Sequence, residues 1–130
     1  MAEDDEGAIA DYTKVIEYNP ESYIGFGRRG IVNDFIGDHE KAVFDFSKAL
    51  DFYYENDKYE LNKIILFMKR GDSKFALEDF KGARFDTNEA ILLNNEKQLL
   101  KNSQLSELYE KLGCINTCLL YTSDAADDVR

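Results

Sequence analysis

Three segments of the chain share one pattern of small, apolar and polar positions. They are AIADYTKVI from Ala8, AVFDFSKAL from Ala42 and ARFDTNEAI from Ala83, and their starts are 34 and 41 residues apart. Steps of zero, four, seven and eight residues place the small and apolar positions on one stripe of an α-helix. In the middle copy this stripe consists of Ala42, Phe46, Ala49 and Leu50. The pattern therefore predicts an internal repeat whose copies are amphipathic helices.

A second shared element precedes the second and third copies. GFGRRGIVNDFIGD and LFMKRGDSKFALED align on Gly30 and Gly71, which are 41 residues apart, like the helices that follow them. Each element has an aromatic residue four positions before the glycine and an aspartate suited to cap the next helix: Phe26 with Asp38, and Phe67 with Asp79. The repeating unit is thus a helix, a tight turn and a helix. Because glycine weakens a helix, its matched placement predicts a close helix crossing, with chance coincidence as the alternative.

These elements resemble the tetratricopeptide repeat, a helical hairpin of roughly 34 residues. Ala42 with Phe46, and Ala8 with Tyr12 and Pro20, match its second-helix pattern. A further first helix matches through Leu105, Ser106, Tyr109, Leu112 and Gly113, so the resemblance spans residues 7–113. It implies an all-α fold, an α-solenoid of antiparallel helix-turn-helix repeats. The chain departs from the family pattern at Arg29 and Arg70 (usually leucine), Asn33 and Lys74 (usually tyrosine), Thr87 (usually aromatic) and Asn95 (usually proline).

This resemblance leads to a division of the chain at residue 117. We expect a repeat domain over 1–117: the second helix of a first unit at 7–19, unit two at 23–56, unit three at 58–95 and the first helix of unit four at 98–113. Only six residues precede Gly7, so we expect the first unit to lack its own first helix, and neither end offers a convincing capping helix. Residues 118–130, CLLYTSDAADDVR, resemble translated sequencing-adapter sequence, and we interpret them as a non-native or disordered tail.

Seven additional residues separate units two and three, within residues 51–63, DFYYENDKYELNK. Asp57 followed by Glu60 has the pattern of a capping box, which predicts an early start to the helix that contains Gly71. The extension is rich in aromatic residues: Phe52, Tyr53, Tyr54 and Tyr59. These side chains either pack the extension onto its neighbours or form an exposed contact patch. We favour packing.

The aspartates of the repeat, Asp11, Asp45 and Asp86, lie off the apolar stripe. A lysine follows the first two aspartates by three residues, at Lys14 and Lys48. This is the spacing of helix-surface ion pairs, which contribute about 0.3 kcal/mol each. We therefore expect the aspartate column to lie on a solvated face.

Composition excludes several classes of partner. With 26 acidic and 16 basic residues the net charge is −10, and a field of that sign repels nucleic acids and anionic membrane surfaces. The longest apolar run, residues 64–68, is far shorter than the roughly 20 residues of a membrane-spanning helix. The sequence leaves the compartment open, with the cytoplasm as the default expectation. We expect a protein or peptide partner, with no nucleic acid, membrane or small-molecule substrate.

Candidate chemistry is sparse. The one histidine, His39, falls in a charged run at the start of a helix, where a surface position is expected. Cys114 and Cys118 have no partners at zinc-site spacing and are interpreted as free thiols. Gly25 and Gly27 belong to a helical pattern with no preceding strand, which disfavours a phosphate-binding loop. We expect no enzymatic activity, no catalytic residues, no cofactor and no metal.

The first helices carry a further stripe that faces away from their own partner helices. In the family that the chain resembles, first helices line a concave groove that holds peptides, and this resemblance selects nine groove candidates: Ile24, Arg28, Ile31, Asp34, Phe35, Ile65, Lys69, Asp72 and Phe75. Packing between repeats is the alternative. Arg28 and Lys69 occupy equivalent places and could pair with a carboxylate of a bound peptide. Gly27 and Ile31 stand where the family's carboxylate clamp has lysine and asparagine, so an apolar or amphipathic ligand is expected.

The resulting function is that of a protein-interaction scaffold that binds a peptide or protein segment. Two alternatives stay open: a structural spacer or oligomerisation arm, and a regulatory repeat region of a larger protein with a separate catalytic domain. Exposed apolar area in the groove distinguishes the first interpretation from the spacer.

Overall fold

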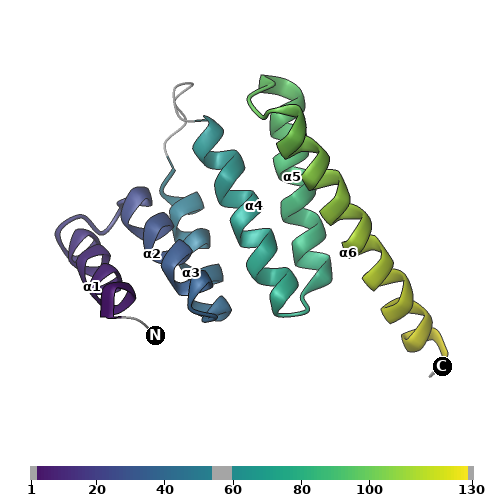
Figure 1. Ribbon diagram of the computed structural model, residues 1–130, viewed down its shortest axis with the longest axis horizontal. Helices are drawn as coiled ribbons and strands as arrows, with labels where there is room; N and C mark the ends of the chain where they lie inside the picture. Colours follow the sequence, from purple (N-terminus) through teal and green to yellow (C-terminus); the bar gives the residue numbers. More distant parts are fainter. Residues whose placement is uncertain (1–2, 54–59, 129–130) are drawn as a thin grey trace.

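A computed structural model describes residues 3–53 and 60–128 of the chain, with side chains for residues 4–53 and 62–122. Over these residues the chain forms six helices, arranged in a row from one terminus to the other (Figure 1). They are α1 (Glu3–Tyr18), α2 (Tyr23–Phe35), α3 (His39–Asp51), α4 (Glu60–Ala76), α5 (Phe80–Lys97) and α6 (Asn102–Asp128). The described part is therefore all-α, as predicted.

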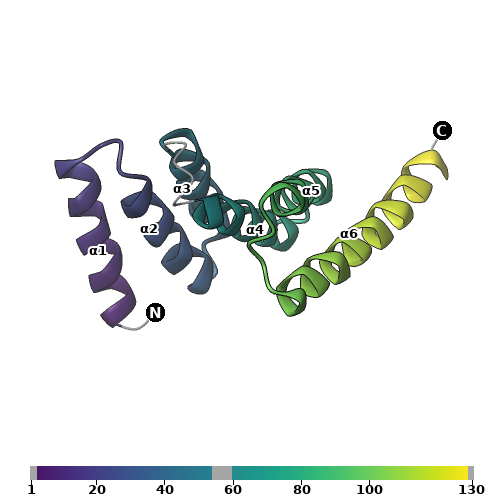
Figure 2. The ribbon, with the colours of Figure 1, turned by 90° about the horizontal axis from the view of Figure 1, so that it is seen from above.

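The helices associate as consecutive antiparallel pairs. The largest interfaces join α2 to α3 and α4 to α5, which are the predicted helix-turn-helix units. Units join through α3 against α4, with smaller interfaces between α1 and α2 and between α5 and α6, and α2 also approaches α4. Figure 2 shows the same order from above, with α1 and α6 at opposite ends. This stacking is the predicted α-solenoid.

The close helix crossing predicted from glycine occurs at Gly30. A Cβ atom on Gly30 would lie 2.8 Å from Cε1 of Phe46, a separation that side chains do not tolerate. Ala42 and Phe46 are both completely buried, as the repeat stripe predicts. At Gly71 a Cβ would lie 3.3 Å from Cβ of Asp86, so this second crossing is less tight.

The turns between paired helices are equivalent in the two units. Asp38 caps α3 by accepting from the backbone N–H of Lys41, and Asp79 caps α5 by accepting from that of Gly82, as predicted. Each turn contains a left-handed residue, Gly37 with φ of 89° and Glu78 with φ of 61°. Glycine suits this conformation, whereas a glutamate adopts it at a cost.

The aspartates of the repeat are not on a solvated face in units two and three, so this expectation was wrong. Asp45 is 1% exposed and Asp86 is fully buried, while Asp11 is exposed. Arg29 Nε and Nη2 each donate to Asp45 at 2.9 Å. Arg70 donates to Asp86 in the same bidentate way, at 2.9 and 2.7 Å. A helix in a solenoid has a neighbour on two sides, so its buried arc is wider than its apolar stripe.

Each arginine has two further contacts, which are equivalent in the two units. Arg29 lies over the ring of Phe26 and Arg70 over that of Phe67, both at 5.6 Å from the centroid. Each donates to a hydroxyl of the preceding second helix, Thr13 or Ser47. The aspartate has one more partner in each unit: Asn33 donates to Asp45 at 3.0 Å, and Lys74 lies 3.1 Å from Asp86. The departures from the family pattern at positions 29, 33, 70 and 74 thus build one buried, repeated polar cluster.

The aromatic extension packs inward at its described end. Phe52 stacks on Phe26 with centroids 5.9 Å apart, and the buried Tyr53 meets Tyr23 edge to face at 5.2 Å. Packing, the favoured alternative, therefore holds for these two rings. Asp57, Tyr54 and Tyr59 lie outside the described residues, so the predicted cap and the rest of the cluster stay predictions.

At the C-terminal end the helix is longer than the repeat pattern predicts. α6 begins at Asn102 and continues to Asp128, through Gly113 and Cys118, instead of ending near residue 113. Leu108 and Ile115 are buried, and Leu108 belongs to the core cluster shared with Ile64 and Ile91. The adapter-like origin of residues 118–130 stays a prediction.

Candidate peptide-binding face

A cavity of about 330 Å³, open to solvent, lies between the first helices of successive units, α2 and α4. It is lined from α2 by Tyr23, Ile24, Gly27, Arg28 and Ile31, and from α4 by Asn62, Ile65 and Leu66. The absence of a side chain on Gly27 brings Leu66 close to the α2 backbone, since a Cβ there would lie 3.3 Å from Leu66 Cδ2. Four of the nine predicted groove residues therefore meet at one cavity.

The rim of this cavity combines apolar surface with one cation. Ile24 is 51% exposed and Ile31 43% exposed, although both are large aliphatic residues. Arg28 is exposed beside them, and no described residue forms an ion pair or hydrogen bond with it. Burial of such aliphatic side chains by a ligand is favourable, at about 25 cal/mol per Å². An unpaired arginine next to them suits a carboxylate.

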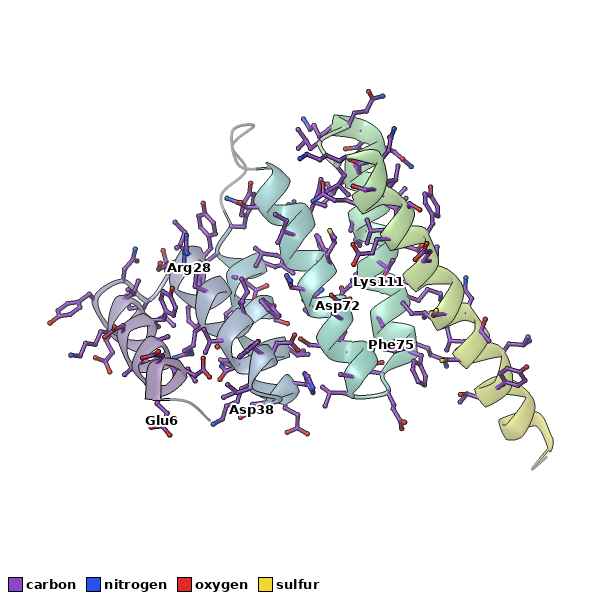
Figure 3. All side chains as sticks on the ribbon, viewed as in Figure 1. Glu6, Arg28, Asp38, Asp72, Phe75 and Lys111 are labelled. Carbon is purple, nitrogen blue, oxygen red and sulfur yellow. The ribbon has the colours of Figure 1, made fainter. Side chains whose placement is uncertain are left out.

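A second cavity, of about 510 Å³, lies between the next pair of first helices, α4 and α6. Its wall consists of Gly71, Asp72, Phe75, Thr87, Glu107, Glu110, Lys111, Cys114 and Ile115. Asp72 and Lys111 point toward one another across it from α4 and α6 (Figure 3), with Lys111 Nζ 3.0 Å from one carboxylate oxygen and 3.1 Å from the other. Two of the predicted groove residues, Asp72 and Phe75, line this cavity.

Electrostatics at Lys111 favour the charged amine. Partial burial lowers the pKa of Lys111, but the hydrogen bonds and charges of Asp72 and Glu107 outweigh it, and the net pKa is raised. Glu107 lies one helical turn away, at 3.5 Å. Lys111 is thus a paired cation, whereas Arg28 has no ion-pair partner among the described residues.

The three remaining groove candidates line neither cavity. Asp34 accepts hydrogen bonds from Ser73 Oγ at 2.7 Å and faces His39 Nδ1 at 2.7 Å, so it joins α2 to α4 and to α3. Phe35 and Lys69 are exposed on the surface of α2 and α4. His39 is half-buried beside Asp34 at the start of α3.

Sequence reasoning missed the contribution of α6 to this face. The groove candidates were chosen from two helices only, yet five lining residues of the second cavity come from α6. The spacing of Leu108 and Ile115, seven residues apart and both buried, is the signal that could have extended the repeat stripe past Gly113.

A third cavity, of about 500 Å³, lies where α1 meets α2 and α3. Glu6 and Asp38, labelled in Figure 3, belong to its wall, as do Arg29 and Asp45. The last two are already bonded to each other in the buried cluster. Arg29 and Asp45 therefore have little free hydrogen-bonding capacity for a ligand in this cavity.

Within the described residues, no group of three or more histidine, cysteine, aspartate or glutamate residues has an arrangement suited to a metal ion. None of the helices in the described part is both long and apolar enough to cross a membrane.

Comparison with known proteins identifies the fold. No family model and no curated protein matches the chain. Among solved structures, the crystal structure of MamA, a tetratricopeptide-like protein, superposes with a TM-score of 0.70 at 21% identity. The match covers 89% of this chain and 59% of the MamA chain, so this chain spans about three fifths of that length. The fold is a tetratricopeptide-like helical repeat.

Proposed function

We propose that this chain is a non-catalytic protein-interaction scaffold that binds a peptide or protein segment along the face formed by α2, α4 and α6. One observation carries the proposal: a cavity lies between each successive pair of first helices, and the α2–α4 cavity has exposed isoleucines around an arginine that pairs with none of the described residues. Apolar side chains at that degree of exposure, gathered at a concave site, mark a contact surface.

The chemistry of the two cavities suggests the character of the ligand. At the α2–α4 cavity an apolar side chain would cover Ile24, Ile31 and Ile65 while an adjacent acidic group pairs with Arg28. At the α4–α6 cavity the cation is already paired with Asp72, so that part of the face favours apolar contacts with Phe75. The ligand is therefore an amphipathic segment with an acidic residue near the α2–α4 end.

The test uses a displayed peptide library selected on the purified chain. A selected peptide is then measured by fluorescence anisotropy against the parent chain and against the double variant Arg28→Ala with Ile31→Ser. We expect the variant to bind at least about tenfold more weakly, because the loss removes both an apolar contact and a charge partner. Affinity for the parent should also fall with added salt.

A matched control comes from the opposite helix layer. Arg84 and Phe85 of α5 are likewise one arginine and one apolar residue, and both are exposed. Arg84→Ala with Phe85→Ser should leave peptide affinity within about twofold, as surface changes away from a site do. Selected peptides that bind both variants equally, or no enrichment at all, would favour the spacer or oligomerisation arm instead. Circular dichroism of each variant confirms that helicity is retained.

A further inference from the structure

The outer face of α1 differs from the equivalent face of the other two second helices. Ala8, Asp11, Tyr12 and Val15 occupy the positions of Ala42, Asp45, Phe46 and Ala49 in α3. All four α3 residues are buried, by contact with α2. In α1, Val15 is 41% exposed, Asp11 is exposed, and Ala8 and Tyr12 are only half-buried.

This face is open because α1 uses its other side to pack on α2. Thr13 accepts from Arg29, and Ile16 belongs to the apolar cluster around Phe26 and Phe46. α1 is also the end of the row in Figures 1 and 2. Most of the side that α3 turns toward α2 is thus left open in α1. Only Val15, at one end of this face, reaches α2, since a Cβ on Gly25 would lie 3.0 Å from its Cγ1.

Asp11 identifies what fits this face. In both complete units the aspartate accepts a bidentate arginine that precedes it by 16 residues on the preceding helix. The arginine lies over an aromatic ring three residues earlier in the sequence. A glycine follows it directly and allows a close approach of the two helices. No described residue hydrogen-bonds or forms an ion pair with Asp11. The carboxylate of Asp11 thus lacks the one partner that its two equivalents share.

We infer that the open face of α1 is the docking surface for one further helix, from outside these 130 residues, that carries the motif aromatic-x-x-Arg-Gly-x-x-(Asn or Lys). Two helices of the chain already have this motif, with Phe26, Arg29, Gly30 and Asn33 in α2 and Phe67, Arg70, Gly71 and Lys74 in α4. The arginine of the docked helix donates two N–H groups to the carboxylate of Asp11. The glycine of its motif leaves room for the ring of Tyr12. Charge complementarity supports this occupant, since α1 has six acidic residues and one lysine, and an arginine would neutralise the exposed carboxylate of Asp11.

The first test uses the full chain and a labelled synthetic peptide with the sequence of residues 22–38, blocked at both ends. We expect saturable binding, measured by anisotropy, with amide chemical-shift changes at α1. Asp11→Asn should weaken this binding about tenfold or more, because a charge pair loses one partner. Glu17→Gln, which also removes an exposed charge from α1, is the matched control and should leave the affinity within about twofold.

The second test removes the cost of folding an isolated short helix, which is unfavourable for 13 residues. Residues 22–41 replace residues 1–7, so that the copied arginine precedes Asp11 by the same 16 residues that separate Arg29 from Asp45. The thermal midpoint should rise relative to the parent chain. The rise should be lost when the copied arginine is changed by Arg29→Met or when Asp11→Asn is introduced.

Several results would overturn the inference. One is that the peptide does not bind and that the thermal midpoint does not rise when residues 22–41 replace residues 1–7. Another is binding that Asp11→Asn leaves unchanged, or shifts confined to the α2–α4 cavity. A third is a parent chain that is dimeric in sedimentation and becomes monomeric with Val15→Asp, because the occupant would then be a second copy of this chain. The peptide-binding proposal for α2, α4 and α6 does not depend on any of these outcomes.

Discussion

The α2–α3 and α4–α5 units have the same polar cluster but different apolar contacts at the helix crossing. In both, a buried aspartate accepts a bidentate arginine that rests on an aromatic ring. At the crossing itself, the first unit has Gly30 against Phe46, whereas the second has Gly71 near Asp86 and Thr87. The hydroxyl of Thr87 donates to the carbonyl of Ala83 within its own helix.

This difference shows that the polar cluster is the constant part of the repeat. The aromatic residue at the helix crossing, Phe46 in the first unit, is not constant. The bidentate pair fixes both the distance and the rotation of the two helices, because the planar guanidinium accepts few geometries. Once that register is fixed, the crossing can hold a phenylalanine or a threonine. The apolar core of the second unit lies elsewhere, around Ile64, Ile91 and Leu108.

Removal of the aspartate should have the largest effect, and it should differ between the units. Asp86→Ala leaves Arg70 and Lys74 without their shared anion, and we expect a loss near the upper end of roughly 3 to 5 kcal/mol in the free energy of unfolding. Asp45→Ala leaves one arginine and a neutral amide, so the loss should be nearer about 3 kcal/mol. Urea unfolding followed by circular dichroism measures both.

Asp11→Ala is the control for this comparison, because it changes the same repeat position where the aspartate is exposed. Its effect should stay within about 0.5 kcal/mol. Equal effects at positions 11 and 86 would show that the buried pairs do not hold the units together.

The side chain at the helix crossing should contribute strongly to stability only in the first unit, where it is Phe46. Phe46→Ala opens a cavity at a fully buried site and should cost about 3 to 5 kcal/mol. Thr87→Ala removes one hydroxyl whose acceptor keeps its helix bond, so the cost should be under about 1 kcal/mol. If Thr87→Ala proved as costly as Phe46→Ala in the same urea titration, the two crossings would be equally dependent on packing.

The glycines should respond to alanine with different magnitudes. Gly30→Ala would drive a methyl group into the ring of Phe46, at a cost of about 1 to 3 kcal/mol. Gly71→Ala meets ordinary contact distances or slightly less, and the gain of about 1 kcal/mol in helix propensity offsets the crowding. We expect its thermal midpoint to lie within a few degrees of the parent. A drop at Gly71 as large as that at Gly30 would contradict the looser crossing.

The smallest predicted effect concerns the turns. Glu78 adopts a left-handed conformation that costs an L-residue about 1 kcal/mol, and its side chain is exposed. Glu78→Gly should therefore stabilise the chain by about 0.5 to 1 kcal/mol. Gly37→Ala, at the equivalent turn, should destabilise it by a similar amount. Thermal melts that move in the same direction for both changes would contradict the equivalence of the turns.

Much of the fold was predictable because it depends on local pattern. The helices of units two and three, the caps at Asp38 and Asp79 and the burial of Ala42 and Phe46 follow from spacing within short segments. The geometry of the proposed binding face was predictable in part, since Ile24, Arg28, Ile31 and Ile65 line one cavity, although their role in binding stays a prediction. Asp34 was predicted as a groove residue from its position along the helix. In the folded chain, however, its carboxylate already contacts Ser73 and His39.

The sequence by itself determined the helical periodicity, the number of repeats that could stack and the acidic character of the surface. Only the tertiary structure decided which polar side chains are buried. Arg29 and Asp45 are each unremarkable in the pattern, one as a departure from the family and one as a residue beside the apolar stripe. Their pairing depends on the distance and rotation between two helices, which no spacing within a single helix contains. Burial of the Asp45 carboxylate is tolerated because an oppositely charged side chain from another helix pairs with it. Only the packing of the two helices brings that side chain into position.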